Sequence, residues 1–327
     1  MSRFVPYIKN LVSQLNLDLS DKVIITELAT NAYFDAALIP LFAGAKKVIY
    51  VDNNVSQEDR AHNKKKLIEI IELNAINSEV SIREFRPLPE DLMEVNILCN
   101  TGALRPLNFN LLQHVNPSNV VIQLMYDSWE VREADIDFDY CRSRGIPIVG
   151  TNESNLSFDI FYNVAPLMLK MCLEVSRIYS ENIFIFSEDD FGDHARKALE
   201  KLNPKSLVQT KDINVLNDKI KNVDLIVLCS YEEDRPLLGK QGILNFIENN
   251  PNVKVVHLFG IVDVEYAKST LNLNIYPDYD GKAMKMSKTF AYIGKEPVID
   301  LFLASYKAGC SFLNNEKSEF IQEVKKL

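Results

Sequence analysis

Glycine is scarce in this sequence, and the shortage limits the kinds of ligand site that the chain can build. Only 11 of its 327 residues are glycine, about half of the roughly 7% share of an average protein. Phosphate-binding loops need several glycines within a few residues, because the backbone must turn tightly and approach the phosphate closely. No G-x-G motif occurs in the chain, so the usual glycine-rich nucleotide cradles are excluded.

Paired cysteines and long apolar runs are also lacking. The closest two of the five cysteines, Cys141 and Cys172, are 31 residues apart, which excludes C-x-x-C motifs and gives no disulfide framework. The four histidines are isolated, and neither H-E-x-x-H nor G-x-S-x-G occurs, so we predict no metal site and no catalytic triad. No apolar run reaches 18 residues, and the first residues form no apolar leader. We therefore expect a cytoplasmic protein with no membrane partner.

The charge balance disfavours a polyanionic partner. The chain carries 36 basic and 45 acidic residues, which gives a formal net charge of −9 and a pI of about 5.1. A nucleic acid would have to bind against this overall field. The basic run Lys64–Lys66 fits the solvated face of a helix. We expect a small-molecule ligand and no nucleic acid, and a homodimer stays open.

Short β-branched runs alternate with amphipathic stretches, which is typical of parallel sheets covered by helices on both faces. Strands are predicted at 22–27, 47–52, 79–85, 95–99, 120–125, 147–150, 183–187, 206–210, 224–229, 254–258 and 273–276. Helices are predicted at 33–43, 56–74, 157–176, 191–202, 214–221, 240–249 and 263–270. Ser56 is expected to cap the second helix, and Gly44 to end the first in the left-handed conformation.

This pattern predicts an α/β protein with two Rossmann-like, doubly wound parallel-sheet domains and a cleft between them. The first domain is predicted to be discontinuous, formed by residues 1–154 and 290–327. The second is predicted at 155–289. Two segments, 157–176 and 297–309, are expected to connect the domains.

The second half of the chain contains five motifs in a definite order. They are CRSRGIPIVGTNE at 141–153, IFIFSEDDFGDHARKALEKL at 183–202, VDLIVLCSYEEDRPLLG at 223–239, LFGIVD at 258–263 and TFAYIG at 289–294. In order and spacing they resemble the D-2-hydroxyacid dehydrogenase family of the formate/glycerate dehydrogenase superfamily. The resemblance implies a two-domain oxidoreductase fold and a dinucleotide site at 183–202. It puts Ser187, Asp189 and Gly192 at the positions of the family's cofactor-binding glycines.

The chain departs from this family at the residues that carry its chemistry. Of the three fingerprint positions only Gly192 is a glycine, and Glu188–Asp190 places negative charge where a pyrophosphate binds. The family's catalytic arginine and histidine fall on Phe259 and Tyr292. Phenylalanine cannot clamp a carboxylate, and an unperturbed tyrosine does not exchange a proton near pH 7. The cofactor is therefore unknown, and NAD(P) is disfavoured.

Polar residues follow two predicted strands of the first half, where ligands of open α/β sheets bind. The loop at 99–106 supplies Asn100, Thr101 and Arg105 as candidate substrate-binding residues, with Arg105 holding an anionic group. A surface ion pair and a simple turn are the competing interpretations. After the strand predicted at 147–150, the resemblance places Asn152 and Glu153 near the bound substrate. Glu153 is a candidate catalytic residue. Helix capping is the alternative for both.

The segment YDSWEVR at 126–132 follows another predicted strand and contains the single tryptophan. Trp129 is expected to pack in the protein or to stack on a planar ligand. Asp127 and Glu130 are three residues apart. If they are buried together, one of them gains a raised pKa and can act as an acid or a base. A solvated pair is the alternative.

Lysines recur every three residues at 282, 285 and 288, beside Tyr279 and Tyr292. If this segment is helical, the lysines form one basic stripe that binds phosphate or carboxylate, with Lys285 as a substrate-binding residue. The same stripe would depress the pKa of one lysine or of Tyr292, the second candidate catalytic residue. A solvent-facing stripe is the alternative.

The leading hypothesis is a small-molecule enzyme on a dehydrogenase-like scaffold whose chemistry has departed from ordinary hydride transfer. It would bind an anionic or polar metabolite in the cleft. Two alternatives remain: an NAD(P)-dependent oxidoreductase with non-standard dinucleotide binding, and a non-catalytic ligand-binding or assembly protein.

Overall fold

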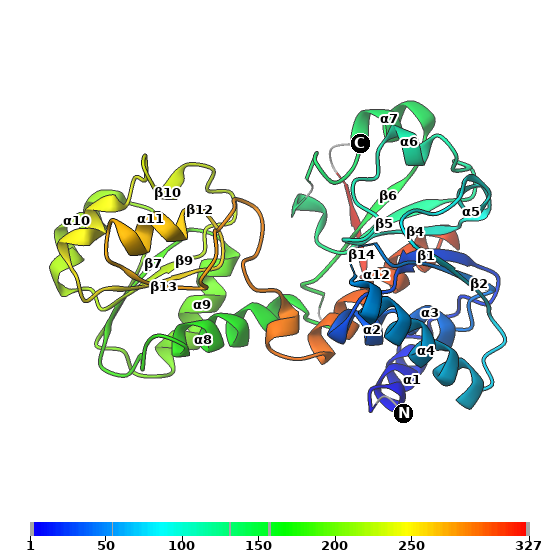
Figure 1. Cartoon of the computed structure of the whole chain (residues 1–327), viewed down its shortest axis with the longest axis horizontal. Coiled ribbons are helices and arrows are strands. Elements are labelled where there is room, and N and C mark those ends of the chain that lie inside the picture. The colour runs from blue at the N-terminus through cyan, green and yellow to red at the C-terminus, as the bar shows by residue number, and fades with distance from the viewer. Residues whose placement is uncertain (1–2, 54, 131, 156–157, 325–327) are drawn as a thin grey trace. The chain divides into compact units, whose positions relative to one another are not determined.

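The chain folds into two compact units (Figure 1), seen in a computed structural model that describes residues 3–53, 55–130, 132–155 and 158–324. The first unit comprises Met1–Ile160 and Gly294–Leu327, and the second comprises Phe161–Ile293. Each contains a sheet of mainly parallel strands, so the predicted α/β class with two parallel sheets is confirmed. The substrate-type and dinucleotide-type roles of the two domains, and the cleft, stay predictions.

The first unit is built on a seven-stranded sheet with the order β14-β6-β5-β4-β1-β2-β3. Its strands are β1 (Val23–Glu27), β2 (Lys47–Val51), β3 (Glu79–Arg83), β4 (Ile97–Asn100), β5 (Val121–Leu124), β6 (Ile148–Thr151) and β14 (Ile321–Glu323). All pairs are parallel except β14 with β6. The four central strands β1, β4, β5 and β6 are buried along their whole length, which explains their continuous apolar runs. The winding reverses between β1 and β4, where open α/β sheets bind ligands.

Helices cover both faces of this sheet (Figure 1). They are α1 (Val5–Gln14), α2 (Asn31–Ala36), α3 (Ile39–Phe42), α4 (Gln57–Leu73), α5 (Pro89–Glu94), α6 (Phe109–Leu112), α7 (Phe138–Arg144) and α12 (Glu296–Leu313). Ser56 caps α4 as predicted, because its Oγ accepts the Asp59 N–H at 3.1 Å. Gly44 has the predicted left-handed conformation, with φ +76°. The single helix predicted at 33–43 is instead the pair α2 and α3. Pro40 stands in the first turn of α3, where proline is tolerated, whereas it would interrupt a continuous helix.

The second unit contains a five-stranded parallel sheet with the order β13-β11-β9-β7-β8. Its strands are β7 (Asn182–Phe186), β8 (Ser206–Gln209), β9 (Leu225–Leu228), β11 (Lys254–His257) and β13 (Asn274–Tyr276), and its helices are α8 (Val164–Leu173), α9 (Asp190–Glu200), α10 (Ile213–Lys219) and α11 (Val264–Ser269). A separate ladder joins β10 (Pro236–Leu238) to β12 (Ile261–Val262). The winding of this sheet reverses between β7 and β9. A ligand of the second unit would be expected at this point, as in other open α/β sheets.

Two further predicted helices differ in the structure. The helix predicted at 157–176 is α8, preceded by the 3₁₀ turn Phe161–Asn163, and its expected start, Ser157, lies outside the described residues. The helix predicted at 240–249 is only a 3₁₀ turn at Asn245–Asn249. The lysine-bearing segment is not helical, because Lys282 and Lys285 form an isolated antiparallel bridge. The condition for a single helical stripe of lysines is therefore not met.

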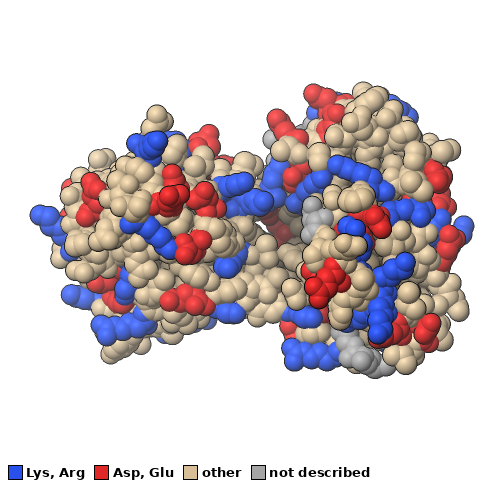
Figure 2. Space-filling model, in the orientation of Figure 1, with Lys and Arg blue, Asp and Glu red and all other residues tan. Residues whose placement is uncertain are grey.

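Acidic and basic side chains are interspersed over the face shown in Figure 2. Among the described residues on this face, no continuous basic surface is offered to a polyanion, which fits the net charge of −9. No helix in the described part of the chain is long and apolar enough to cross a membrane.

Gly150 lets strand β6 pass close to the 3₁₀ turn Ser128–Glu130. A Cβ atom on Gly150 would lie 2.7 Å from the Cβ and 2.8 Å from the backbone nitrogen of Ser128, distances that real Cβ contacts do not reach. This glycine therefore allows the close approach of two segments that carry candidate site residues.

We expect Gly150→Ala to lower the free energy of unfolding by about 1–3 kcal/mol, because the added methyl group must push the Ser128 backbone aside. Urea denaturation measures the change. Gly102→Ala is the control, since its Cβ would lie 3.8 Å from the nearest atom. Equal losses in the two variants would contradict the steric explanation.

Candidate functional site

Polar residues gather at the carboxyl ends of β1, β4, β5 and β6, because parallel strands end at one edge of their sheet. β1 ends at Glu27 and β4 at Asn100, and these two strands flank the point where the winding reverses. The set, called here the edge cluster, consists of Glu27, Asn100, Thr101, Arg105, Tyr126, Asp127, Glu130, Arg132 and Glu153. Seven of the nine are buried, and the two arginines are partly exposed.

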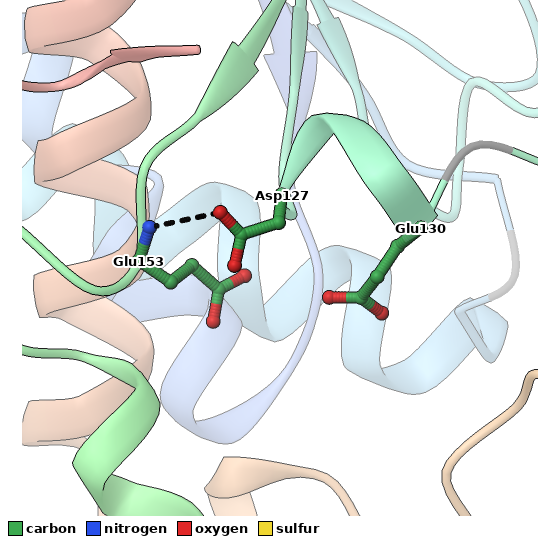
Figure 3. A group of neighbouring side chains, drawn as sticks. All are labelled: Asp127, Glu130 and Glu153. Carbon is green, nitrogen blue, oxygen red and sulfur yellow. Dashed lines mark hydrogen bonds between the residues drawn. The ribbon is translucent and has the colours of Figure 1, made fainter. Parts of the chain in front are cut away.

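Three carboxyl groups of the edge cluster point toward one another (Figure 3). Asp127 follows β5, Glu130 ends the 3₁₀ turn Ser128–Glu130, and Glu153 follows β6. One oxygen of each lies within 4.8 Å of the others, and the Glu153 N–H donates to Asp127 Oδ1 at 3.3 Å. The turn is held from the sheet edge, where Ser128 N–H donates to Gln322 Oε1 at 2.5 Å. Asp127 and Glu130 are thus buried together and do not form the solvated pair that was the alternative.

This crowding changes the protonation of Glu153. Burial raises the pKa of Glu153 well above the usual range of a carboxyl group, and the charges of Glu130 and Asp127 raise it further. The Arg132 guanidinium acts in the opposite direction. Glu153 therefore holds its proton to a higher pH than an ordinary glutamate, which suits a general acid near neutral pH.

Two guanidinium groups of the edge cluster lie against the ring of Tyr126. The Cζ atoms of Arg105 and Arg132 are 5.3 Å and 4.9 Å from the ring centroid. Asn100 fixes Arg105, accepting from its Nε at 3.0 Å through Oδ1 and from its Nη2 at 2.7 Å through the backbone oxygen. The Asn100 amide in turn donates to the Tyr126 hydroxyl at 2.7 Å. Arg105 is thereby preorganised, yet 24% of its side chain stays exposed, so an anion can reach it.

Acidic partners hold the two arginines in place. Asp135 lies 3.4 Å from Arg105 Nε and 3.6 Å from Arg132 Nη1, and Glu130 lies 3.5 Å from Arg132 Nη2. The ion pair considered for Arg105 as an alternative is thus present, with Asp135 as the partner. A cavity of about 560 Å³ in the same unit is lined by residues outside the edge cluster, among them Pro106, Asp137 and Arg142.

Glu27 closes the other end of the cluster, beside Thr101. Its Oε2 accepts the Ala103 N–H at 3.2 Å. Burial raises the pKa of Glu27, whereas this hydrogen bond and the Arg105 charge lower it. Glu27 is a site residue that the sequence reasoning missed, although its position as the last residue of an apolar strand was a usable signal.

The edge cluster can hold a proton at Glu153, on which the Arg132 charge acts, and it also contains the partly exposed Arg105. This combination suits proton transfer to an anionic substrate. Its three carboxylates are also the hard oxygen ligands that Mg²⁺ and Ca²⁺ prefer. Sequence spacing could not reveal this set, because Glu153 lies 23 residues after Glu130 and joins it only through the sheet.

Two other candidates of this region have different surroundings. Asn152 is tied to the segment before β14, where its Nδ2 donates to the Glu319 oxygen at 2.8 Å and its N–H to the Phe320 oxygen at 3.0 Å. Its amide nitrogen therefore already fixes the end of β6. Trp129 is 45% exposed, so it is not a core residue.

In the second unit, Asp189 lies at the reversal point between β7 and β9. Its Oδ1 accepts the Gly192 N–H at 3.3 Å and the Ser187 hydroxyl at 2.7 Å, and its Oδ2 accepts the Tyr231 N–H at 2.8 Å. The Gly192 N–H in the first turn of α9 and the Tyr231 N–H after β9 are the donors that would face a bound phosphate. A Cβ on Gly192 would lie 2.4 Å from Ser187 Oγ, so this glycine serves close packing.

Aromatic rings fill the space next to this carboxylate. Phe191 stacks on Tyr231 with centroids 5.7 Å apart, and Phe259 contacts both rings edge-on at 4.6 and 5.2 Å. All three side chains are at most 2% exposed. A dinucleotide does not fit these residues, because Asp189 uses the phosphate donors, adds repulsion and is backed by packed rings. Phe259, at the position of the family's catalytic arginine, belongs to this core.

Tyr292 and Lys285 also lie in the second unit. The Tyr292 hydroxyl donates to Glu174 and accepts from Tyr276 at 2.8 Å. Burial and these hydrogen bonds raise the pKa of Tyr292 above its usual value, so the lowered pKa that the sequence analysis allowed for Tyr292 is wrong, and the residue stays protonated at neutral pH. Lys285 is exposed, whereas Lys288 lies over the Tyr292 ring at 5.1 Å. The catalytic and binding roles of Tyr292 and Lys285 stay predictions.

No protein-family model matches the chain, and no curated protein matches its sequence. Solved structures do resemble it. A dipicolinate synthase chain of Bacillus subtilis is 9% identical over 92% of this chain and 100% of its own length, with a TM-score of 0.56. The dipicolinate synthase chain of Bacillus halodurans is 10% identical over 88% of this chain and 96% of its own, with a TM-score of 0.55.

A pyruvate reductase of Chlamydomonas reinhardtii is 9% identical over 91% of this chain and 98% of that chain, with a TM-score of 0.55. At such identities the likeness shows the fold alone. The resemblance to the D-2-hydroxyacid dehydrogenase family is thus confirmed at the level of the fold.

The protonation of Glu153 leads to a prediction about stability. Because the folded-state pKa of Glu153 is raised, its contribution to stability is full below about pH 4.3 and is lost as the pH rises toward the folded-state value. Each unit of pKa difference corresponds to about 1.4 kcal/mol. We expect Glu153→Gln to remove this loss, so the variant gains stability relative to the native chain as the pH rises from 4 to 8.

Urea denaturation across this pH range measures the difference, with the exposed Glu232→Gln as the control. A parallel pH dependence of Glu153→Gln and the native chain would show that Glu153 is not perturbed.

The closed reversal point of the second unit leads to a prediction about cofactors. We expect neither NAD nor NADP to raise the melting temperature in a thermal-shift titration, since Asp189 and the aromatic rings leave no room for the pyrophosphate. A dinucleotide at 100 times its Kd would stabilise the fold by about 2.7 kcal/mol. Saturable stabilisation would favour the NAD(P)-dependent alternative.

Proposed function

We propose that this protein is a small-molecule enzyme on a dehydrogenase-type scaffold and that its reaction is not NAD-linked hydride transfer. The substrate is an anionic or polar metabolite bound at the edge cluster of the first unit. The observation that carries the proposal is the buried carboxyl group of Glu153, held within 4.8 Å of two further carboxylates and acted on by the Arg132 charge.

The proposed roles follow from these surroundings. Arg105, fixed by Asn100 and partly exposed, binds the anionic group of the substrate, and Arg132 adds positive charge against the same Tyr126 ring. Glu153 donates a proton as a general acid, and the neighbouring carboxylates make that proton available near neutral pH. Thr101, buried beside Glu27, orients the substrate.

The second unit supports the part of the proposal that excludes hydride transfer. A nicotinamide cofactor would need the phosphate donors that Asp189 already uses. We therefore assign no step to a dinucleotide. A cytoplasmic location and a homodimer stay predictions.

Mass spectrometry of the purified protein tests the binding half of the proposal. We expect the native chain to release a small anionic or polar molecule on denaturation, and Arg105→Ala to retain at least tenfold less of it, because a charged hydrogen bond is lost. Arg196→Ala, at an exposed position of α9, is the charge-matched control. Equal retention by the Arg105 and Arg196 variants would place the site elsewhere.

Turnover of the released molecule then tests the catalytic half. Glu153→Gln is expected to keep the Kd and to lower kcat by about 10² to 10⁴, the usual contribution of a general acid. Unchanged kcat in this variant would remove Glu153 from the reaction. Binding without any turnover by the native chain would favour the non-catalytic alternative.

A further inference from the structure

A separate cavity of about 520 Å³ lies in the first unit, between the start of α1, helix α4 and the residue before α12. Four basic side chains line it: Arg3, His62, Lys66 and Lys295. One acidic side chain, Glu69, faces the same space and is exposed. None of these residues belongs to the edge cluster. We call this cavity the basic pocket.

The cations of the basic pocket are held against aromatic rings and one buried carboxylate. Lys66 Nζ is 3.9 Å from the centroid of Phe34, and Lys295 Nζ is 2.5 Å from Oδ2 of the fully buried Asp35. Arg3 and Lys295 also lie over the ring of Phe4, at 4.8 and 5.3 Å from its centroid. The cationic groups are therefore fixed in place and are not loose surface side chains.

Lys66 has no ion pair among the described residues, and the nearby Asp35 is paired with Lys295. Burial lowers the pKa of Lys66, the Asp35 charge opposes this, and the Lys295 ammonium adds to it. Arg3, Lys66 and Lys295 stand against the carboxylates of Asp35 and Glu69, which leaves a net positive charge for an anion to neutralise.

The remaining wall of the basic pocket is apolar. Phe4, Ile70 and Leu73 line it, and 65% of the Leu73 side chain is exposed. A ligand that carries an apolar group next to its charge would cover this surface and gain the free energy of its burial. Inorganic phosphate alone would not use it.

We propose that the basic pocket binds a small organic anion, whose phosphate or carboxylate group contacts Lys66 and Lys295 and whose apolar part contacts the exposed Leu73. The basic run Lys64–Lys66, which the sequence pattern assigned to a solvated helix face, contains residues of two kinds. Lys64 and Lys65 are exposed, whereas Lys66 is partly buried and lines the pocket.

Isothermal titration calorimetry of the full chain with phenyl phosphate tests this site. We expect one molecule to bind per chain, more tightly than inorganic phosphate. Lys66→Met should raise the Kd about tenfold, and Lys66→Arg should restore most of the affinity because it keeps the charge. Lys65→Met, which removes the same charge from the exposed face of α4, should leave the Kd unchanged.

Two further variants keep the test decisive if Lys66→Met fails to fold. Glu69→Gln, at an exposed position, is expected to lower the Kd, because it removes the carboxylate that faces the anion. Arg196→Ala, at an exposed position outside both sites, should leave phenyl phosphate binding unchanged. Because none of these variants alters the edge cluster, a failure here is separate from a failure of the proposed function.

Three results would overturn the proposal: no binding of phenyl phosphate, equal losses in Lys65→Met and Lys66→Met, or a loss in Arg196→Ala. Sedimentation with phosphatidylserine vesicles tests the source of the anion. Cosedimentation that depends on Lys66 would show that a lipid headgroup is the ligand and would overturn the assignment to a free small molecule.

Discussion

Charged groups at the carboxyl ends of buried parallel strands need partners, because an uncompensated charge out of water is costly. Both units depend on how this constraint is met. In the first unit the chain places three carboxyl groups in one site and supplies guanidinium groups on one side only. Burial and the negative charges of the two neighbouring carboxylates raise the pKa of Glu153, so this carboxyl group keeps its proton to a higher pH. In the second unit the charge of Asp189 is fully satisfied by hydrogen bonds from both sides of the reversal point.

The two reversal points are therefore built in opposite ways. The one in the first unit is polar and keeps 24% of the Arg105 side chain exposed. The one in the second unit is closed by a carboxylate and by three packed rings. The scarcity of glycine acts locally here, because the loop from Ser187 to Gly192 has the residues of a self-capped helix and lacks those of a phosphate cradle.

Much of the fold could be predicted from the sequence because buried parallel strands are short, continuous apolar runs with clear ends. Every strand expected from such a run is present, within about two residues of its predicted bounds. Helix boundaries were harder where proline or tertiary packing decides, as at Pro40 and in the segment around Lys282. The site was only partly predictable. Asn100, Arg105 and Glu153 follow strands and could be named, but the pairing of Glu153 with Asp127 and Glu130 depends on strand order, which periodicity does not contain. Asp189 was predicted to repel a phosphate, and its role as an internal acceptor required the position of Tyr231.

The antiparallel strand β14 has a consequence for the order of events during synthesis. It completes the first sheet beside β6, and its Gln322 holds the turn that carries Glu130. The second unit is encoded entirely between Phe161 and Ile293, so all of its strands leave the ribosome before β14 does. Domains generally fold as units in the order of their synthesis. The second unit can thus become compact before β14 is made, whereas the Gln322 contact that holds the turn carrying Glu130 forms only after β14 has been made.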